Sequence, residues 1–541
     1  MIRIITDSGV ELEIAPDASF DIEIENPFFT EEIPVPWSTS IAFPLTPLNR
    51  KIFGFYDAFL LEPSEKEIQA SIYLGGLPMM SGTLKYDSYE EGRLNYCFTG
   101  RGFEDDFSVK LFNLEMPCPA LSGAATALEV KNRLIRGDVQ GVFAPPCINQ
   151  AKTATSLTAG SDVKFHNYPS SSVGTMVSPA ILAQKILEIG APNLDFTVPD
   201  DVAVLGLFHD VDNYPLCLAD NIAVVLPDIT LSEFIQSLCR MYKGAIFKDD
   251  TGYKMIRFSP ILSDSDVLDL DELIADSVSM SREEAKGYNL EFKDNNPNNS
   301  NYDSETTPTG QTVFEHSIDN VLNAMAASGN YIPVKHMYIG DIYSGKREGA
   351  QSSITVLDDI LFSNGQKASD DSDDMEVCEV GFKLLRVVPF RYRDYTPRGD
   401  DVSQPVNSYH NAMMPLITPL KLGEDRPEDV FIGVMAGGYL VDKGRIDIED
   451  DPTYDHRDEQ AAYGITPSLL RSRFHTGYAS WISKDRQVIS IDLNLTELQI
   501  AQFRIWKKVS LASRRWIVRK ITFSFAGGID GALTNAELIS L

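Results

Sequence analysis

The sequence is poor in positive charge and lacks the long apolar runs of membrane and secreted proteins. Its 541 residues include 47 Lys or Arg and 78 Asp or Glu, which gives a formal net charge of −31. Because phosphate backbones and anionic lipids repel such a chain, gripping nucleic acid or a membrane surface is disfavoured. No run approaches the roughly 20 apolar residues that span a bilayer, and Met1–Ile14 does not look like a secretory signal. We expect no membrane contact.

Cysteine motifs are also missing. The six cysteines lie far apart and form no Cys-x-x-Cys pair, so neither a zinc ribbon nor a redox motif is indicated: Cys97, Cys118, Cys147, Cys217, Cys239 and Cys378. In a chain of this length they are typical of reduced, mostly buried residues. We therefore expect synthesis in a reducing cytoplasm.

The sequence does contain the pattern of a packed globular protein that is rich in strands. Hydrophobic residues make up 43% and charged residues 23%. Alternation of period two predicts a hairpin from residues 10–14 and 20–25, and an antiparallel meander through residues 68–74, 82–86 and 94–98. Between them, Asn26–Phe55 has five prolines before residue 48, which favour an extended arm or an edge.

Helical patterns are confined mainly to the middle of the chain. Ser178 and Pro179 suggest a helix that ends at Gly190. Thr230 and Glu233 form a capping box before a helical apolar stripe, and a strand–turn–strand pattern follows over residues 245–258. Towards the end we expect a strand over residues 489–495, a short helix from about Thr496, and strands over residues 508–511, 516–525 and up to 541.

These patterns predict a mainly β protein with an α+β middle and antiparallel β-barrel or β-sandwich domains at both ends. The expected units are residues 1–115 (N-terminal antiparallel β), 116–295 (α+β), 296–400 (linker and β-rich) and 401–541 (C-terminal β with a basic strip). The polar run 295–310 and the acidic tract Asp370–Asp374 are the clearest breaks.

No motif carries clear chemistry. Gly340–Arg347 resembles a phosphate-binding loop, but Arg347 stands where Ser or Thr would ligate magnesium, and a surface turn is favoured. Asp447–Asp458 resembles a calcium loop, but Pro452 replaces its essential glycine. The seven histidines are scattered singly, and no Gly-x-Ser-x-Gly turn is present. We expect no enzyme, no cofactor and no metal site.

One basic segment stands out in this acidic chain. No acid occurs between Leu498 and Ile529, while basic residues alternate with tryptophans there. Nucleic-acid binding would explain this pattern, but a subunit contact is favoured because Trp and Arg are common interface anchors. A neighbouring copy of so acidic a chain would also supply the anions. The candidate interface residues are Arg504, Trp506, Lys507, Lys508, Arg514, Arg515, Trp516, Arg519 and Lys520.

Three segments resemble phage tail proteins. Ser19–Phe28 with Phe43–Arg50 is similar to the opening of tail proteins from phages and prophages of Bacteroides-type bacteria. Leu226–Gly252 is similar to a segment of tail-hub, or baseplate-hub, proteins. Lys508–Ile521 with Glu537–Ile539 resembles their closing β domain.

The resemblance implies a structural virion protein without catalytic activity. Tail hubs form rings, usually trimers, that join the tail tube to the tip and leave a channel for genome ejection. The partners would be copies of this chain and other tail proteins, with DNA only in transit and no membrane. The location would be the virion tail, after synthesis in the host cytoplasm. The proline-rich arm would reach a neighbouring subunit.

Two alternatives remain open. The first is a distal tail or adaptor ring protein. The second is a carbohydrate-binding or carbohydrate-cleaving tail-tip protein, since aromatic residues make up 10% of the chain. An exposed row of aromatics beside paired carboxylates would favour the second alternative.

Overall fold

The computed structural model describes residues 2–30, 32–54, 67–117, 141–143, 147–150, 163–166, 180–196, 205–208, 221–249, 252–293, 333–338, 341–348, 351–356, 375–384, 386–393, 397–398, 401–405, 409–417, 430–440, 470–526 and 532–541. Within these ranges the protein is mainly β, as the sequence predicts, and most strand pairs are antiparallel. None of the helices in these ranges is long and apolar enough to cross a membrane.

The largest sheet has 14 strands and combines both ends of the chain. Its strands are β1 (Ile2–Thr6), β2 (Glu11–Leu12), β3 (Ser19–Glu25), β4 (Trp37–Ser38), β5 (Ile41–Pro44), β6 (Ile68–Leu74), β7 (Leu77–Glu90), β8 (Arg93–Gly100), β17 (Val267–Asp269), β18 (Ile274–Glu283), β30 (Arg486–Leu495), β31 (Lys508–Leu511), β32 (Arg514–Ala526) and β33 (Ala532–Ser540).

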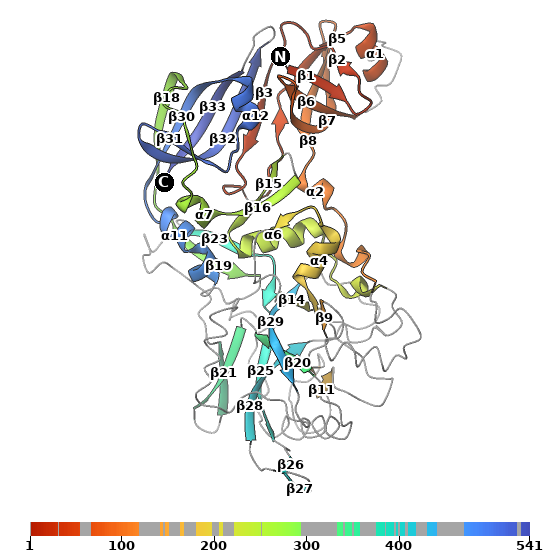
Figure 1. Ribbon diagram of the computed structural model, residues 1–541, viewed down its shortest axis with the longest axis vertical. Coiled ribbons are helices and arrows are strands. Elements are labelled where there is room, and N and C mark those ends of the chain that lie inside the picture. Colours follow the sequence, from red (N-terminus) through yellow and green to blue (C-terminus); the bar gives the residue numbers. More distant parts are fainter. Residues whose placement is uncertain are drawn as a thin grey trace.

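The N-terminal and C-terminal strands join where β3 pairs with β32. Seven residue pairs form this ladder, from Ser19 opposite Ala526 to Glu25 opposite Lys520. Figure 1 shows the red N-terminal strands beside the blue C-terminal ones at the top of the molecule. The strand order is β18-β30-β33-β32-β3-β4-β8-β7-β6-β1-β2, and the described strands form an open sheet, not a closed barrel.

The middle of the molecule is an α+β region below this sheet (Figure 1). The helices of the described ranges are α1 (Pro47–Phe53), α2 (Phe103–Asp106), η1 (Leu111–Asn113), α4 (Ala183–Gly190), η3 (Ile222–Val225), α6 (Leu231–Met241), α7 (Phe258–Ser263), η6 (Arg471–His475), α11 (Thr476–Ile482) and α12 (Glu497–Gln502). Strands β13 (Asp195–Phe196), β15 (Gly244–Asp249) and β16 (Gly252–Arg257) form one small sheet, and β19 (Gly287–Phe292) pairs with β23 (Met375–Val380) in another.

The other end of the molecule contains the remaining strands. They are β9 (Val142–Phe143), β10 (Cys147–Gln150), β11 (Val163–His166), β12 (Ala180–Leu182), β14 (Leu205–Phe208), β20 (Pro333–Tyr338), β21 (Asp341–Glu348), β22 (Gln351–Val356), β24 (Lys383–Leu384), β25 (Arg386–Arg393), β26 (Pro397–Arg398), β27 (Asp401–Pro405), β28 (Tyr409–Ile417) and β29 (Phe431–Leu440). They form two six-stranded sheets and one two-stranded pair.

Local patterns predicted several elements correctly. In α6, the Thr230 hydroxyl accepts a hydrogen bond from the Glu233 amide at 3.2 Å, and the Glu233 carboxylate accepts one from the Thr230 amide at 2.5 Å. The β15–β16 hairpin follows it as expected, and α12 begins after the Thr496 cap. The meander β6–β7–β8 and the strands β30 to β33 are also confirmed.

Two local predictions are wrong and a third is confirmed in part. Residues 10–14 and 20–25 do not pair with each other, because β2 pairs with β1 while β3 pairs with β32 and β4. For Asn26–Phe55, predicted as an arm or an edge, the edge is confirmed, since β5 pairs with β8 alone among the described strands, while the Asn26 side-chain amide holds the start of the segment to the carbonyls of Ile505 and Val518 in the same chain. The helix expected from Pro179 begins at Ala183, since Ala180–Leu182 forms β12.

The remaining predictions concern one loop motif, three polar or acidic segments and the division into four units. The phosphate-loop-like segment lies largely in β21, which pairs with β22 and is not followed by a helix within the described residues. The polar run 295–310, Asp370–Asp374 and Asp447–Asp458 lie outside the described residues. The four-unit division stays a prediction, although strands from three of those units share the 14-stranded sheet.

Candidate functional site

The predicted interface residues lie on β31, β32 and the loop before them, but several are buried in their own chain. Trp516 is 3% exposed, and its indole N–H donates to the Leu511 carbonyl at 3.2 Å. Lys508 is 1% exposed, and its ammonium donates to the carbonyls of Leu262 and Asp264. Loss of water on burial lowers the pKa of Lys508. These two side chains stabilise the fold of this chain.

Other members of the predicted interface form ion pairs within the chain. Lys507 pairs with Asp266, and Lys520 pairs with Glu23 at 2.6 Å. Arg519 contacts two carboxylates, Glu283 at 2.7 Å and Glu537 at 3.1 Å. Three of these four acids, Glu23, Asp266 and Glu283, lie more than 200 residues away in the sequence, so much of the basic segment is neutralised by carboxylates that the fold brings to it.

Arg504 and Trp506 line a cavity of about 430 Å³ between the large sheet and the β15–β16 hairpin. The Trp506 ring lies 5.1 Å from the Phe247 ring, centroid to centroid, and the Lys254 ammonium lies 4.8 Å from the Trp506 centroid. The structure thus places Arg504 and Trp506 at a mainly apolar pocket. Trp516 does not line this pocket.

Arg514 and Arg515 are the predicted residues that point most clearly to solvent. They follow the two-residue turn between β31 and β32, where Ala512 and Ser513 have φ values of 52° and 61°. Two consecutive positive φ values fit the tight turn that matches strand twist. Within the described part of the chain neither arginine has a carboxylate within ion-pair distance, and Arg514 donates to the Gln487 amide oxygen at 2.8 Å. A subunit-contact role for the segment stays a prediction, and these two residues are its most accessible members.

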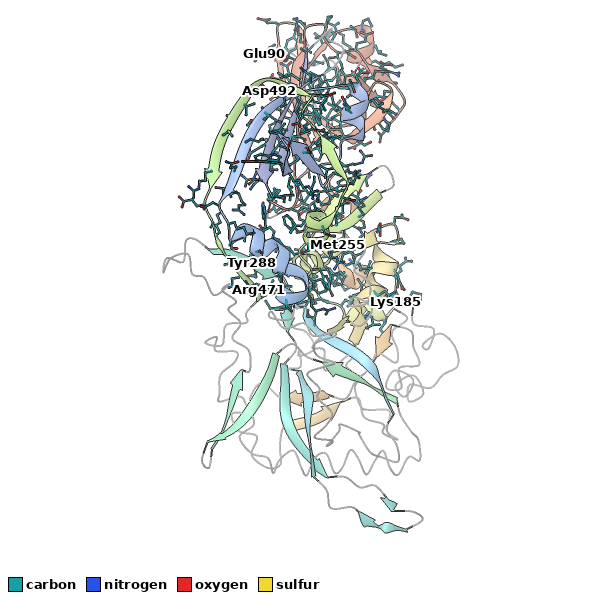
Figure 2. The ribbon with its side chains drawn as sticks, turned by 60° about the vertical axis from the view of Figure 1, so that its left-hand side comes forward. Glu90, Lys185, Met255, Tyr288, Arg471 and Asp492 are labelled. Atoms are coloured by element: carbon teal, nitrogen blue, oxygen red, sulfur yellow. The ribbon has the colours of Figure 1, made fainter. Side chains whose placement is uncertain are left out.

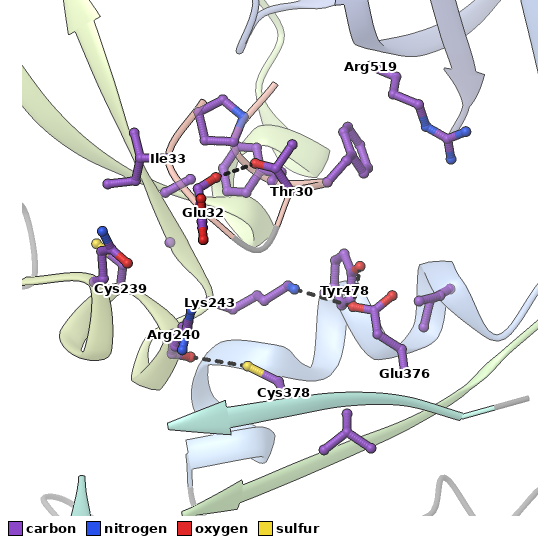
Figure 3. Close-up of a pocket in the computed structure, with 18 of the residues that line it drawn as sticks. Thr30, Glu32, Ile33, Cys239, Arg240, Lys243, Glu376, Cys378, Tyr478 and Arg519 are labelled. Atoms are coloured by element: carbon purple, nitrogen blue, oxygen red, sulfur yellow. Dashed lines mark hydrogen bonds and ion pairs between the residues drawn. The ribbon is translucent and has the colours of Figure 1, made fainter. Parts of the chain in front are cut away.

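A cavity of about 740 Å³ was not foreseen from the sequence (Figure 3). It lies between the loop that contains Thr30 and Glu32, helix α6 and strand β15, strand β23, and helix α11. Its lining residues come from six separate parts of the chain and follow no common sequence spacing. No sequence signal marks such a site, because only the tertiary structure brings its walls together.

Charges on the wall of this cavity are paired with one another. The Lys243 ammonium lies 3.6 Å from the Glu376 carboxylate and 3.5 Å from the centroid of the Tyr478 ring. The Tyr478 hydroxyl donates to Glu376 at 2.6 Å, and burial, with the nearby carboxylate, raises the pKa of Tyr478. Trp481 lies on the same helix as Tyr478, and the Arg486 guanidinium stacks over it at 4.6 Å from the ring centroid.

This arrangement bears on the carbohydrate alternative. Sugar rings bind to open aromatic faces, but cations already cover one face of Tyr478 and one of Trp481. Both aromatic side chains are at least 93% buried, with exposed fractions of 3% and 7%. The pocket therefore lacks the exposed aromatic row that this alternative requires.

Nucleophilic and metal chemistry find little support in the described residues. Cys239, at the edge of the cavity, is buried, and burial raises the pKa of its thiol, which disfavours the reactive thiolate. No group of three or more His, Cys, Asp or Glu side chains in the described ranges is arranged to hold a metal ion.

His475, the last residue of η6, is fully buried. Its Nδ1 is 2.7 Å from the Tyr288 hydroxyl, and its Nε2 is 2.9 Å from the Met241 carbonyl. Since a carbonyl only accepts, Nε2 carries the proton and Nδ1 accepts from Tyr288. Burial lowers the pKa of His475 to about 3, so the ring is neutral and structural at ordinary pH.

No family model matches the sequence, and no curated protein does. Solved structures that resemble the chain include the 43 kDa tail protein of prophage MuSo2 from Shewanella oneidensis, with 10% identity, a TM-score of 0.35, and 100% of this chain and 98% of that chain covered. A tail protein from Neisseria meningitidis MC58 has 8% identity and a TM-score of 0.32, with 100% and 96% covered. Prophage tail protein gp18 from Listeria monocytogenes EGD-e has 7% identity and a TM-score of 0.31, with 99% and 94% covered.

Proposed function

We propose that this chain is a structural protein of a phage tail, placed at the hub or baseplate, and that it acts by assembly and not by catalysis. In this role it forms a homo-oligomeric ring, with three copies as the expected number, that joins the tail tube to the tip. Other tail proteins are its partners, and DNA passes through without being held.

The observation that carries the proposal is the 14-stranded sheet in which both ends of the chain meet. It combines the strands of residues 2–100 with those of residues 486–540, the two terminal regions whose sequences resemble tail proteins. A large sheet with free edges, built from distant parts of one chain, is suited to extended contacts between subunits.

The pairing of the charged side chains that line the 740 Å³ cavity supports an assembly role over catalysis. In the 740 Å³ cavity, the Lys243, Arg486 and Arg519 side chains are each within 4 Å of a carboxylate of the same chain. A catalytic site needs a nucleophile or an acid–base group directed at a substrate, whereas these groups contact one another. Such paired networks are typical of a structural junction.

The net charge of −31 fits a channel that releases DNA. An acidic wall repels phosphate groups, so a genome in transit would slide along it without binding. The basic segment of residues 504–520 is largely engaged by acids and carbonyls of its own chain, and so adds little attraction for DNA.

Imaging of the phage particle that carries this chain tests the proposal. With a small folded domain fused to the chain, we expect extra density at the tail tip, repeated around the tail axis. A chain that is absent from the tail, or whose purified form binds or cleaves glycans, would overturn the proposal. Extra density one ring higher, at the tube end, would favour the distal tail alternative.

A further inference from the structure

Strand β18 forms one end of the 14-stranded sheet, and its outer edge is unpaired within the described part of the chain. It pairs with β30 alone, with Val278 opposite Ile491, Met280 opposite Ile489 and Arg282 opposite Gln487. Figure 2 shows β18 as the outermost green strand at the left of the molecule. An edge of this kind presents free backbone donors and acceptors to another chain.

The apolar face of the sheet continues onto β18 without cover. Ile489 and Ile491 are 2% and 0% exposed, whereas the residues opposite them, Met280 and Val278, are 68% and 54% exposed. The other face of β18 carries Ser279 and Ser281. The strand thus has the alternation of a half-buried strand, while its apolar side chains remain in water.

Positive charge flanks this apolar edge. Met280 and Arg282 lie on the same face, Gln487 is opposite Arg282, and Gln487 accepts a hydrogen bond from Arg514. Arg282 is paired with Asp485, but Arg514 has no such carboxylate among the described residues. The surface is therefore apolar and cationic on a chain whose net charge is −31.

We infer that Val278 and Met280 at this edge, together with Arg514 on the same face of the sheet, form a contact surface for a second copy of this chain. Charge complementarity selects that occupant, because an apolar, cationic edge attracts an acidic surface and each further copy brings one. The contact is heterologous, since the edge meets a different surface of the next copy, and repetition of such contacts generates a ring when the rotation closes. The inference rests on the proposed assembly role. It assigns the contact between neighbouring copies, here called the seam, to this edge.

Sedimentation velocity on the full chain over a range of concentrations tests the seam. We expect the wild type to self-associate and Met280→Glu to raise the dissociation constant by about tenfold or more, because it places a carboxylate on the apolar edge. The matched control is Leu533→Glu, which changes a similarly exposed residue (51%) on β33 of the same sheet. The variant Arg514→Ala should also weaken association, and by less at high salt than at low salt.

A photoreactive amino acid at position 280 identifies the partner. The expected product joins two copies of this chain, with the second attachment point in an acidic surface segment. A wild type that is monomeric at its highest soluble concentration, equal weakening by the two glutamate variants, or cross-links only within one chain would overturn the seam. None of these results would remove the chain from the tail tip in particle images, so failure of the seam and failure of the proposed function are distinguishable.

Discussion

Lys507 and Lys508 show how neighbouring residues of the same type take different roles. Lys507 is on the surface and pairs with Asp266, while Lys508 is buried and donates to two carbonyls. The sequence presents both as members of one basic segment, because charge and spacing say nothing of which side chain the strand turns inward. Burial separates the two roles.

Alanine variants of the two lysines should therefore differ in stability. We expect Lys508→Ala to lower the free energy of unfolding by about 2 kcal/mol or more, since two buried carbonyls lose a charged donor. Lys507→Ala, the matched control, should cost about 0–1 kcal/mol, as for an exposed ion pair. Urea denaturation of both variants measures the difference. Equal losses would contradict the structural role of Lys508.

His475 gives a pH dependence with a definite sign. Its pKa is about 3 in the folded chain and about 6.5 when exposed, so the unfolded state binds a proton that the folded state does not. Between these values the free energy of unfolding falls as the pH is lowered, by about 1.4 kcal/mol per pH unit from this group. Above pH ~6.5 it contributes no slope.

Comparison with His475→Gln isolates this contribution from that of the carboxylates. The variant keeps a side-chain N–H for the Met241 carbonyl but has no titrating ring. Denaturant midpoints measured from pH 7 to pH 4 should show a shallower decline for the variant than for the wild type. Parallel declines would show that His475 is protonated in the folded chain.

At the scale of elements, helices and turns followed from sequence better than strand pairing did. The capping box at Thr230, the hairpin β15–β16 and the cap at Thr496 depend on residues three or four apart, so local sequence specifies them. The pairing of β3 with β32 joins residues about 500 positions apart, and no local pattern records it. The period-two alternation of β3 predicted a strand correctly and its partner wrongly.

The proline-rich segment shows the same limit. Its prolines rule out a long central strand, and β4 and β5 are indeed short. Of the two expected forms, an arm or an edge, the structure shows the edge: the buried Asn26 is held by the Ile505 and Val518 carbonyls, and Phe53 packs against Phe43 and Tyr96. Extended backbone needs partners for its polar groups, and here its own chain supplies them.

At the scale of the whole molecule, the shared sheet implies that the two ends of the chain fold together. A fragment of residues 1–115 would leave the β32-facing edge of β3 unpaired and expose Phe20, which packs against Phe525 at 5.4 Å between centroids. We expect this fragment to aggregate, or to show little amide protection in β3 by hydrogen exchange.

Co-expression with residues 470–541 supplies the control. If β32 is the missing partner, the second fragment should restore protection in β3, and the two fragments should purify together. A fragment of residues 1–115 that is monomeric and fully protected by itself would show that the first predicted unit is an independent domain.

Sequence by itself determined the class of this protein: mainly β, strongly acidic, with an α+β middle whose helix α6 is specified by its own caps. These properties depend on composition and on residues close together in the chain. Tertiary structure alone decided that both ends form one sheet, that Trp516 and Lys508 are buried, and that Met280 remains in water at an edge. These three features depend on contacts between residues hundreds of positions apart. The alternation of apolar and polar residues in a strand determines which face of the sheet a side chain takes, but it does not determine which strand, or which molecule, will cover that face.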